Sequence, residues 1–254
     1  MQYSNKYTIV FTVAVCLVCS VAVSSLAVAL KDRQQSNVKL ERQVNILRVA
    51  ELVEPGENPN AAEAGELFKQ IETIIVDRVT GEIVNDFPNP QAYDSIKAAK
   101  DLNLSKTAPP NRSQISRLPD KLVVYEVSAA GKESYIIPVY GAGLWSTMYG
   151  FLAFEKDCNT IKGLTFYQHG ETPGLGGEID NKAWQALWRG KKAYKGGQPA
   201  IKVVKGSGSG EYEVDGLSGA TLTAKGVTHM MHFWLQDVGY GKFLQVRSQG
   251  GANG

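Results

Sequence analysis

The sequence contains too few cysteines for a fold held together by disulfide bonds. There are three in 254 residues, and two of them, Cys16 and Cys19, lie in an apolar run near the N-terminus. Small secreted modules stapled by disulfides need a denser set, so this class is excluded. The Cys-x-x-Cys spacing matches redox motifs, but two small thiols on an apolar helix are more typical of packing residues.

A charge excess of one sign is also absent. The chain has 27 Lys and Arg against 25 Asp and Glu, a formal net charge of +2. Such a balance creates no strong field for gathering polyanions, so we expect no nucleic-acid partner. With 43% hydrophobic and 20% charged residues and no internal repeat, the composition is that of a globular protein.

The longest uncharged run covers residues 8–30 and is rich in Val, Ala and Leu. About 20 apolar residues cross the hydrocarbon core of a bilayer, so residues 1–30 are predicted to be an N-terminal membrane anchor. A cleavable signal peptide is the alternative, because Lys6 precedes the run and residues 27–29 resemble a cleavage site. The anchor is favoured because a signal peptide has an apolar region of only about 7–15 residues.

The basic residues near the anchor do not decide its orientation. Lys31, Arg33, Lys39 and Arg42 follow the run, and the positive-inside rule applied to them places the C-terminal bulk in the cytoplasm. A long domain, however, can cross the membrane largely regardless of such charges.

Beyond the anchor, the pattern predicts a juxtamembrane helix and linker over residues 31–60 and one domain over residues 61–254. A helix is expected at residues 61–72, and residues 86–117 are polar and contain proline, which predicts an irregular excursion. The class is α+β: a twisted, largely antiparallel sheet with flanking helices, preceded by one transmembrane helix. The predicted strands are residues 71–77, 122–127, 134–140, 148–154, 161–167, 200–205 and 211–214, and helices are expected from Asp180 to Arg189 and over residues 223–236.

Two motifs favour ordinary structure over chemistry. Residues 206–210 (GSGSG) lead into a strand-like segment and not into a helix, so they are predicted to form a flexible hairpin loop and not a dinucleotide site. His229 and His232 lie three residues apart on a predicted helix rich in apolar residues, which is more typical of core packing than of metal binding, so we predict no metal site.

Residues 215–223 (DGLSGATLT) carry the strongest functional signal. Small residues lead directly into a helix, where free amides and the hydroxyls of Ser218, Thr221 and Thr223 would suit a phosphate. A simple N-cap is one alternative. A hydrolase with Ser218 as nucleophile is another, because residues 216–220 differ from a Gly-x-Ser-x-Gly elbow at one position, but it needs a histidine base within reach.

Residues 215–221 (DGLSGAT) resemble the flavinylation motif of FMN-binding domains. Residues 139–146 (VYGAGLWS) and 169–176 (HGETPGLG) are similar to one branch of that family, the C subunit of the sodium-translocating NADH:quinone reductase. The related G subunit of the Rnf electron-transport complex shares much of the pattern and remains an alternative, as does a noncatalytic tethered binding module. The single anchor, the length and the motif order also match, so the resemblance covers the whole chain.

The resemblance implies a cofactor and its site. FMN would be joined through its phosphate to the hydroxyl of Thr221 by an FAD-dependent, magnesium-dependent FMN transferase, and we expect Asp215 to help that enzyme position the hydroxyl. The noncovalent contacts that it implies are Gly143, Leu144, Trp145, Glu171, Thr172, Pro173, Gly174, Leu175, Gly176, Ser218, Gly219, Ala220, Leu222 and Thr223.

The function implied by the resemblance is electron transfer within a sodium-pumping NADH:quinone oxidoreductase. The chain would act with other membrane, flavin and iron–sulfur subunits and would have no turnover alone. It would cross the bacterial inner membrane once, with its FMN domain on the periplasmic side.

Overall fold

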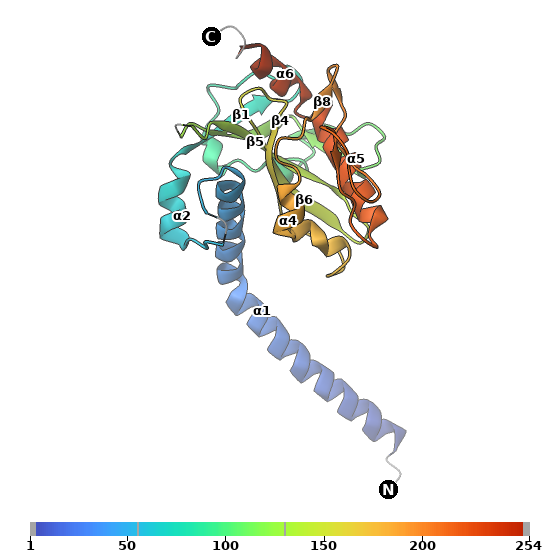
Figure 1. The fold of residues 1–254 in the computed structure, drawn as a ribbon. Coiled ribbons are helices and arrows are strands. Elements are labelled where there is room, and N and C mark those ends of the chain that lie inside the picture. Colours follow the sequence, from blue (N-terminus) through green and yellow to red (C-terminus); the bar gives the residue numbers. More distant parts are fainter. Residues whose placement is uncertain (1–3, 55, 130, 251–254) are drawn as a thin grey trace. The chain divides into compact units, whose positions relative to one another are not determined.

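The computed structural model describes residues 4–54, 56–129 and 131–250. It divides the chain into two compact units, Met1–Arg42 and Gln43–Gly254. Helix α1 (Asn5–Val49) is continuous, and its last residues belong to the second unit (Figure 1). The helix predicted from residue 31 is present as the continuation of α1, because no glycine or proline interrupts residues 5–49.

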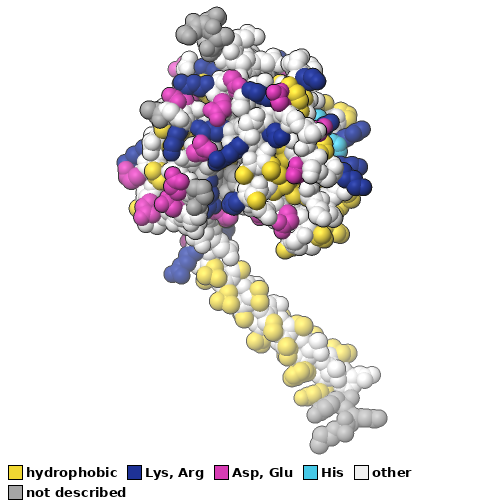
Figure 2. Space-filling model, in the orientation of Figure 1, with side chains coloured by type: hydrophobic (Ala, Val, Ile, Leu, Met, Phe, Trp, Pro, Cys, Tyr) yellow, Lys and Arg dark blue, Asp and Glu magenta, His cyan; other side chains and the backbone are white. Residues whose placement is uncertain are grey.

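The N-terminal part of α1 has the length and composition to cross a membrane. Its most apolar window has a mean hydropathy of 2.6 and no buried residue, and no other described helix is both long and apolar enough. Figure 2 shows hydrophobic side chains along this helix, with Lys and Arg after them. Such a large exposed apolar surface is suited to lipid. Cys16 and Cys19 are free and exposed on it.

The second unit is built on a five-stranded antiparallel sheet in the order β1-β4-β5-β6-β7. The bounds are β1 (Ile71–Asp77), β4 (Lys121–Val127), β5 (Ser134–Ala142), β6 (Thr147–Phe154) and β7 (Ile161–Gln168). They confirm the α+β class and the predicted central strands. Ile137 lies opposite Leu152, which aligns the apolar side chains of β5 and β6 on one face.

The helices and strands between α1 and β4, other than β1, are short. Helix α2 (Ala61–Phe68) begins with a capping box of Asn60 and Glu63. The predicted excursion contains η1 (Pro90–Ala92), α3 (Ser95–Ala98) and an antiparallel pair of strands, β2 (Ser105–Thr107) and β3 (Arg117–Pro119). This pair folds residues 105–119 back beside the sheet, so the excursion is more ordered than predicted.

The C-terminal part differs from the prediction at several points. The N-cap of α4 (Lys182–Ala186) is Asn181 and not Asp180, which ends the 3-10 helix η2 (Gly176–Asp180). Strands β10 (Lys202–Val203) and β11 (Glu213–Val214) are parallel, so the loop between them is not a hairpin. Helix α5 (Thr221–Leu235) begins two residues early, and α6 (Gly241–Gly250) follows it. Strands β8 (Tyr194–Lys195) and β9 (Gln198–Pro199) form one further pair.

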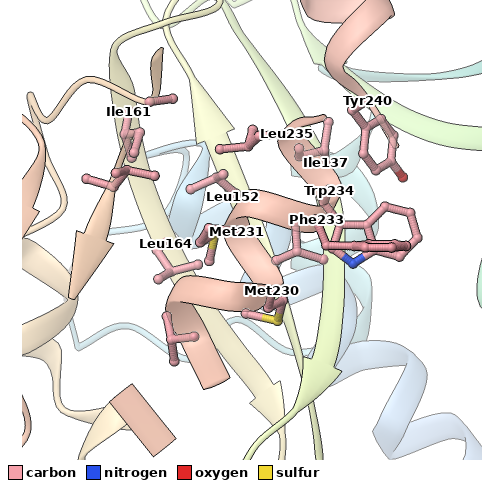
Figure 3. Close-up of a cluster of buried hydrophobic side chains, with 14 of the residues drawn as sticks. Ile137, Leu152, Ile161, Leu164, Met230, Met231, Phe233, Trp234, Leu235 and Tyr240 are labelled. Carbon is pink, nitrogen blue, oxygen red and sulfur yellow. The ribbon is translucent and has the colours of Figure 1, made fainter. Parts of the chain in front are cut away.

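The core lies between α5 and one face of the sheet. Met230, Met231 and Phe233 of α5 pack among the side chains of Ile137, Leu152 and Leu164 (Figure 3). The Trp234 indole donates to the Tyr140 carbonyl at 2.7 Å. Because the direction of α5 is fixed by this packing, the position of its first turn is fixed too.

The end of α1 covers the opposite face of the sheet. The Thr165 hydroxyl donates to the Asn45 side chain at 2.7 Å, and a Cβ on Gly163 would lie 3.1 Å from Val49. Both β7 residues alternate with Leu164, which faces α5. The sheet is therefore packed on both faces.

Candidate functional site

Thr221 is the first residue of α5 and is exposed. Ala220 occupies the N-cap position, and no side-chain cap bond is found there within the described chain. The amides of the first turn are therefore available to an anion, and the helix dipole favours negative charge at that point. Lys225, also exposed, follows one turn later. The simple N-cap alternative fails, because no side chain of residues 215–223 caps the helix.

The Glu171 carboxylate ties this helix to two loops. Its Oε1 accepts from the Trp145 amide at 2.9 Å, and its Oε2 accepts from the Leu144 amide at 3.1 Å and from the Thr223 hydroxyl at 2.5 Å. A weaker bond comes from the Ser146 amide at 3.4 Å. One side chain thus joins the residue 143–146 loop, the residue 171–176 loop and the first turn of α5.

Glu171 is held as a charged group. Burial raises the pKa of its carboxyl, but the hydrogen bonds from Thr223 and from the amides of Trp145, Leu144 and Ser146 outweigh burial, so the pKa lies below its ordinary value of 4.5. Only 4% of Glu171 and 1% of Thr223 is exposed. Their polar atoms face each other, so they support the site from beneath and do not form its surface.

Glycines allow the loops to approach this carboxylate. A Cβ on Gly143 would lie 2.5 Å from Glu171 Oε1, and one on Gly176 would lie 2.5 Å from the Thr223 hydroxyl oxygen. A Cβ on Gly226 would lie 2.5 Å from the Ala142 carbonyl oxygen. These distances are shorter than carbon–oxygen contact, so only glycine fits at the three positions. Gly226 was not predicted as a site residue, because a glycine within a helix gives no chemical signal.

His169 and Ser146 hold the two loops together from the other end. The Glu171 amide donates to His169 Nδ1 at 3.1 Å, which leaves the ring proton on Nε2, 2.7 Å from Asp180 Oδ2. The Ser146 hydroxyl accepts from the Gly170 amide at 2.6 Å. All of these hydrogen bonds stabilise the conformation of the two loops.

The surface of the loops above Glu171 and Thr223 is apolar and exposed. Leu175 lies against Gly219, where a Cβ would be 2.9 Å from Leu175 Cδ2, so the residue 171–176 loop reaches the segment before Thr221. Thr172, Pro173 and Gly174 are exposed at the tip of that loop, as are Ser218 and Gly219, whereas Gly176 and Ala220 are buried. The exposed large apolar side chains are Leu144 at 45%, Trp145 at 71%, Leu175 at 44% and Leu222 at 56%.

Asp215 has a structural bond within the motif. Its Oδ1 accepts from the Gly208 amide at 2.8 Å, and its backbone carbonyl accepts from the Trp184 indole at 2.9 Å. The glycine-rich loop of residues 206–210 therefore packs against the segment that leads to Thr221.

The described residues bring together neither a serine–histidine pair at Ser218 nor a cluster of metal-binding side chains. Within the described chain, no hydrogen bond joins Ser218 to a histidine: His169 bonds Asp180, and His232 Nε2 lies 2.8 Å from the Ile201 carbonyl oxygen. Burial is the main cause that lowers the pKa of His229. The described residues contain no group of three or more His, Cys, Asp or Glu side chains placed to hold a metal.

Comparison with known proteins identifies the family. The FMN-binding domain family matches residues 143–236. The C subunit of the Na(+)-translocating NADH-quinone reductase of Vibrio anguillarum is 46% identical over 98% of each chain, and that of Pseudomonas aeruginosa is 45% identical over 99% of each.

Two solved structures share the fold. The crystal structure of Shewanella oneidensis NqrC superposes with a TM-score of 0.74 at 35% identity, covering 82% of this chain and 97% of that one. The C subunit from Parabacteroides distasonis gives 0.66 at 32% identity, covering 85% and 96%. The chain therefore belongs to the family of C subunits of the Na(+)-translocating NADH-quinone reductase, and it contains an FMN-binding domain.

Proposed function

We propose that this chain is the membrane-anchored electron-transfer subunit of a sodium-pumping NADH:quinone reductase, with FMN joined by a phosphoester to Thr221. The observation that carries the proposal is the exposed Thr221 hydroxyl at the first position of α5, inside a segment that matches the FMN-binding domain family. FMN bound there would supply one- and two-electron chemistry.

The residues around Thr221 fit such a group. First-turn amides without a side-chain cap would bind the phosphate, and Lys225 adds positive charge one turn away. The exposed side chains of Leu144, Trp145 and Leu175 would pack against the ring. Glu171 and Thr223 would keep the loops in place before the cofactor arrives, which limits the entropy lost on binding.

The partners follow from the family. Other subunits of the reductase would donate and accept the electrons, and an FAD-dependent FMN transferase would load the cofactor. Asp215 would help that enzyme from its place six residues before the hydroxyl, where one carboxylate oxygen is already held by Gly208. A tether to Thr221 would retain the cofactor while electrons enter and leave, and the isolated chain would have no turnover.

Mass spectrometry of the chain coexpressed with its transferase tests the attachment. We expect the peptide that contains Thr221 to carry the mass of FMN, and Thr221→Ala to lose all of it. Ser218→Ala removes a nearby exposed hydroxyl and is the matched control, which should keep the adduct. A bare peptide in the parent chain, or an adduct that survives in Thr221→Ala, would refute the proposal.

We also propose that the FMN domain lies on the periplasmic side. A chain with Cys16→Ser and Cys19→Ser, and with Ser248→Cys as its reactive thiol, can be labelled with a membrane-impermeant maleimide, since Cys158 is buried. Labelling in intact spheroplasts supports the periplasmic side. Labelling confined to inverted vesicles would place the domain in the cytoplasm, as the basic residues after the anchor suggest.

A further inference from the structure

A turn at residues 101–105 presents two leucine side chains to solvent. Leu102 is 73% exposed and Leu104 is 48% exposed. Among the large apolar side chains described in the second unit, Leu102 has the largest exposed fraction, and Trp145 follows at 71%. Trp145 belongs to the surface assigned above to the flavin, whereas the turn contains no residue of that surface. Two neighbouring leucines exposed on one turn are therefore an apolar surface that the flavin site does not explain.

Hydrogen bonds hold this turn in place. The Asp101 carbonyl accepts from the Ser105 hydroxyl at 2.5 Å and from the Leu104 amide at 3.3 Å. The Arg117 guanidinium donates to the Ser105 carbonyl at 2.6 Å and to the Ser105 hydroxyl oxygen at 2.8 Å. The Asp120 amide donates to the Leu104 carbonyl at 2.8 Å. The leucines cannot turn inward without breaking these bonds, so their exposure is set by the backbone.

Lysine side chains border the turn. Lys97 and Lys100 are exposed, and in the part of the chain that the structure describes no ion pair joins either of them to an acidic group. Lys106 lies 3.8 Å from Asp120, and its side chain is 70% exposed. The Asp94 carboxylate accepts from two backbone amides as the cap of α3. The apolar surface is thus bordered by positive charge, which complements an acidic border on a partner.

A protein fits this surface better than lipid does. Asn103 lies between the two leucines and Asp101 precedes them, and both residues are exposed. The hydrocarbon of a bilayer offers no hydrogen-bond partners for an amide or a carboxylate, so inserting the turn there would cost free energy. A protein surface can place such partners beside apolar side chains. The relatives of this chain are named as subunits of a reductase, so other subunits are available as partners.

We propose that Leu102 and Leu104 form a docking surface for another subunit of the reductase, which presents an apolar patch bordered by acidic side chains. The leucines are buried against that patch, and Lys97 and Lys100 face the acidic border. Two leucines cover little area, so the turn is one part of a larger contact. The proposal rests on the family to which the chain belongs and not on FMN at Thr221.

Labelling at the tip of the turn tests whether a subunit covers it. The full chain carries Asn103→Cys together with Cys16→Ser and Cys19→Ser, since Cys158 is buried. It is placed in nanodiscs of one lipid composition, alone or assembled with the other subunits, and mass spectrometry follows the maleimide adduct on the peptide that contains residue 103. We expect labelling to be about tenfold slower in the assembled complex, because docking excludes solvent. Ser248→Cys in the same background is the control and should react at the same rate in both.

Substitutions then identify the groups that dock. Leu102→Gln and Leu104→Gln should each raise the labelling rate in the complex about tenfold, because each removes the burial of one leucine side chain. Lys100→Glu should raise it too, because it reverses a charge that faces the acidic border. Val246→Gln changes an aliphatic side chain of α6 that is 49% exposed, and as the matched control it should have no effect. All four variants should keep the parent melting temperature as isolated chains, since the replaced side chains are exposed.

Three results would overturn the proposal. Equal labelling rates in the isolated chain and in the complex would show that no subunit covers the turn. Labelling of the isolated chain in nanodiscs as slow as in the complex would identify lipid as the cover. An equal effect of Val246→Gln and Leu102→Gln would place the contact elsewhere. The comparison can be repeated in Thr221→Ala, so failure of docking and failure of flavin attachment are told apart.

Discussion

At the scale of single residues, Glu171 is the organising group of the site. Its two oxygens accept from the Leu144 and Trp145 amides and from the Thr223 hydroxyl, so it fixes the spacing of three segments that are far apart in the sequence. From the sequence, Glu171 and Thr223 were expected to touch the cofactor. That contact stays a prediction, and the structure shows both side chains buried and hydrogen-bonded to each other beneath the loops.

Two replacements of Glu171 should distinguish what its charge contributes to stability from what its size contributes. Glu171→Gln keeps the size but loses one acceptor oxygen, and we expect a loss of about 1–3 kcal/mol in the free energy of unfolding. Glu171→Ala leaves every donor unpaired and should cost more. Urea unfolding of the full chain in detergent, followed by tryptophan fluorescence, measures both.

The pH dependence gives an independent check on Glu171. Because its folded pKa lies below 4.5, the unfolded chain takes up this proton first as the pH falls. Its contribution to stability is therefore complete above the ordinary value and is lost as the pH falls through the folded value. The parent should lose stability relative to Glu171→Gln in that range, whereas the exposed Glu72→Gln should follow the parent. Parallel curves for parent and Glu171→Gln would show that the carboxylate is not held as charged.

At the scale of elements, the function proposed for Thr221 requires the first turn of α5 to be placed accurately. Its position depends on the close approach of Gly226 to the Ala142 carbonyl and on the core contacts of residues such as Met230. An error of one residue in the helix start would turn Thr221 away from the surface.

Gly226→Ala should therefore displace α5 from the sheet. The added Cβ would meet backbone, which cannot rotate away, so we expect a loss of about 1–3 kcal/mol in unfolding free energy despite the better helix propensity of alanine. The flavin adduct on Thr221 should decrease with it. Lys225→Ala, on the exposed side of the same helix, should change stability by less than about 0.5 kcal/mol. If Gly226→Ala left the free energy of unfolding unchanged, the contact of Gly226 with the Ala142 carbonyl would not be what positions the helix.

The strands and the motif could be predicted from the sequence, but their spatial relations could not. Alternation and short turns are local signals, and they gave β4 to β7 to within two residues. The parallel pairing of β10 with β11 depends on tertiary contacts, which no local pattern encodes. Thr221 can be proposed from the sequence because its motif is contiguous. The close approach of Gly226 to the Ala142 carbonyl could not be predicted, because these residues come from distant segments with no shared motif.

At the scale of the whole molecule, one helix serves two environments. Residues 8–30 of α1 are exposed and apolar, whereas Val44, Ile46 and Leu47 near its end are buried in the second unit. Composition alone separates these parts poorly, since both are rich in aliphatic residues. Charge separates them, because Lys31 and Arg33 mark where the apolar run ends.

The folded unit should therefore need the end of α1 but not its beginning. A chain that starts at Asn37 keeps the buried residues with enough helix before them, and we expect it to be soluble without detergent and to melt as the full chain does. A chain that starts at Ala50 loses Val44, Leu47 and the bond from Thr165 to Asn45, and each buried aliphatic side chain contributes about 1.5–3 kcal/mol. Its melting temperature by circular dichroism should fall by more than about 10 °C, or it should fail to fold. Equal melting of the two chains would show that these residues pack on the sheet without stabilising it, and the anchor and the FMN domain would then be joined by a simple linker.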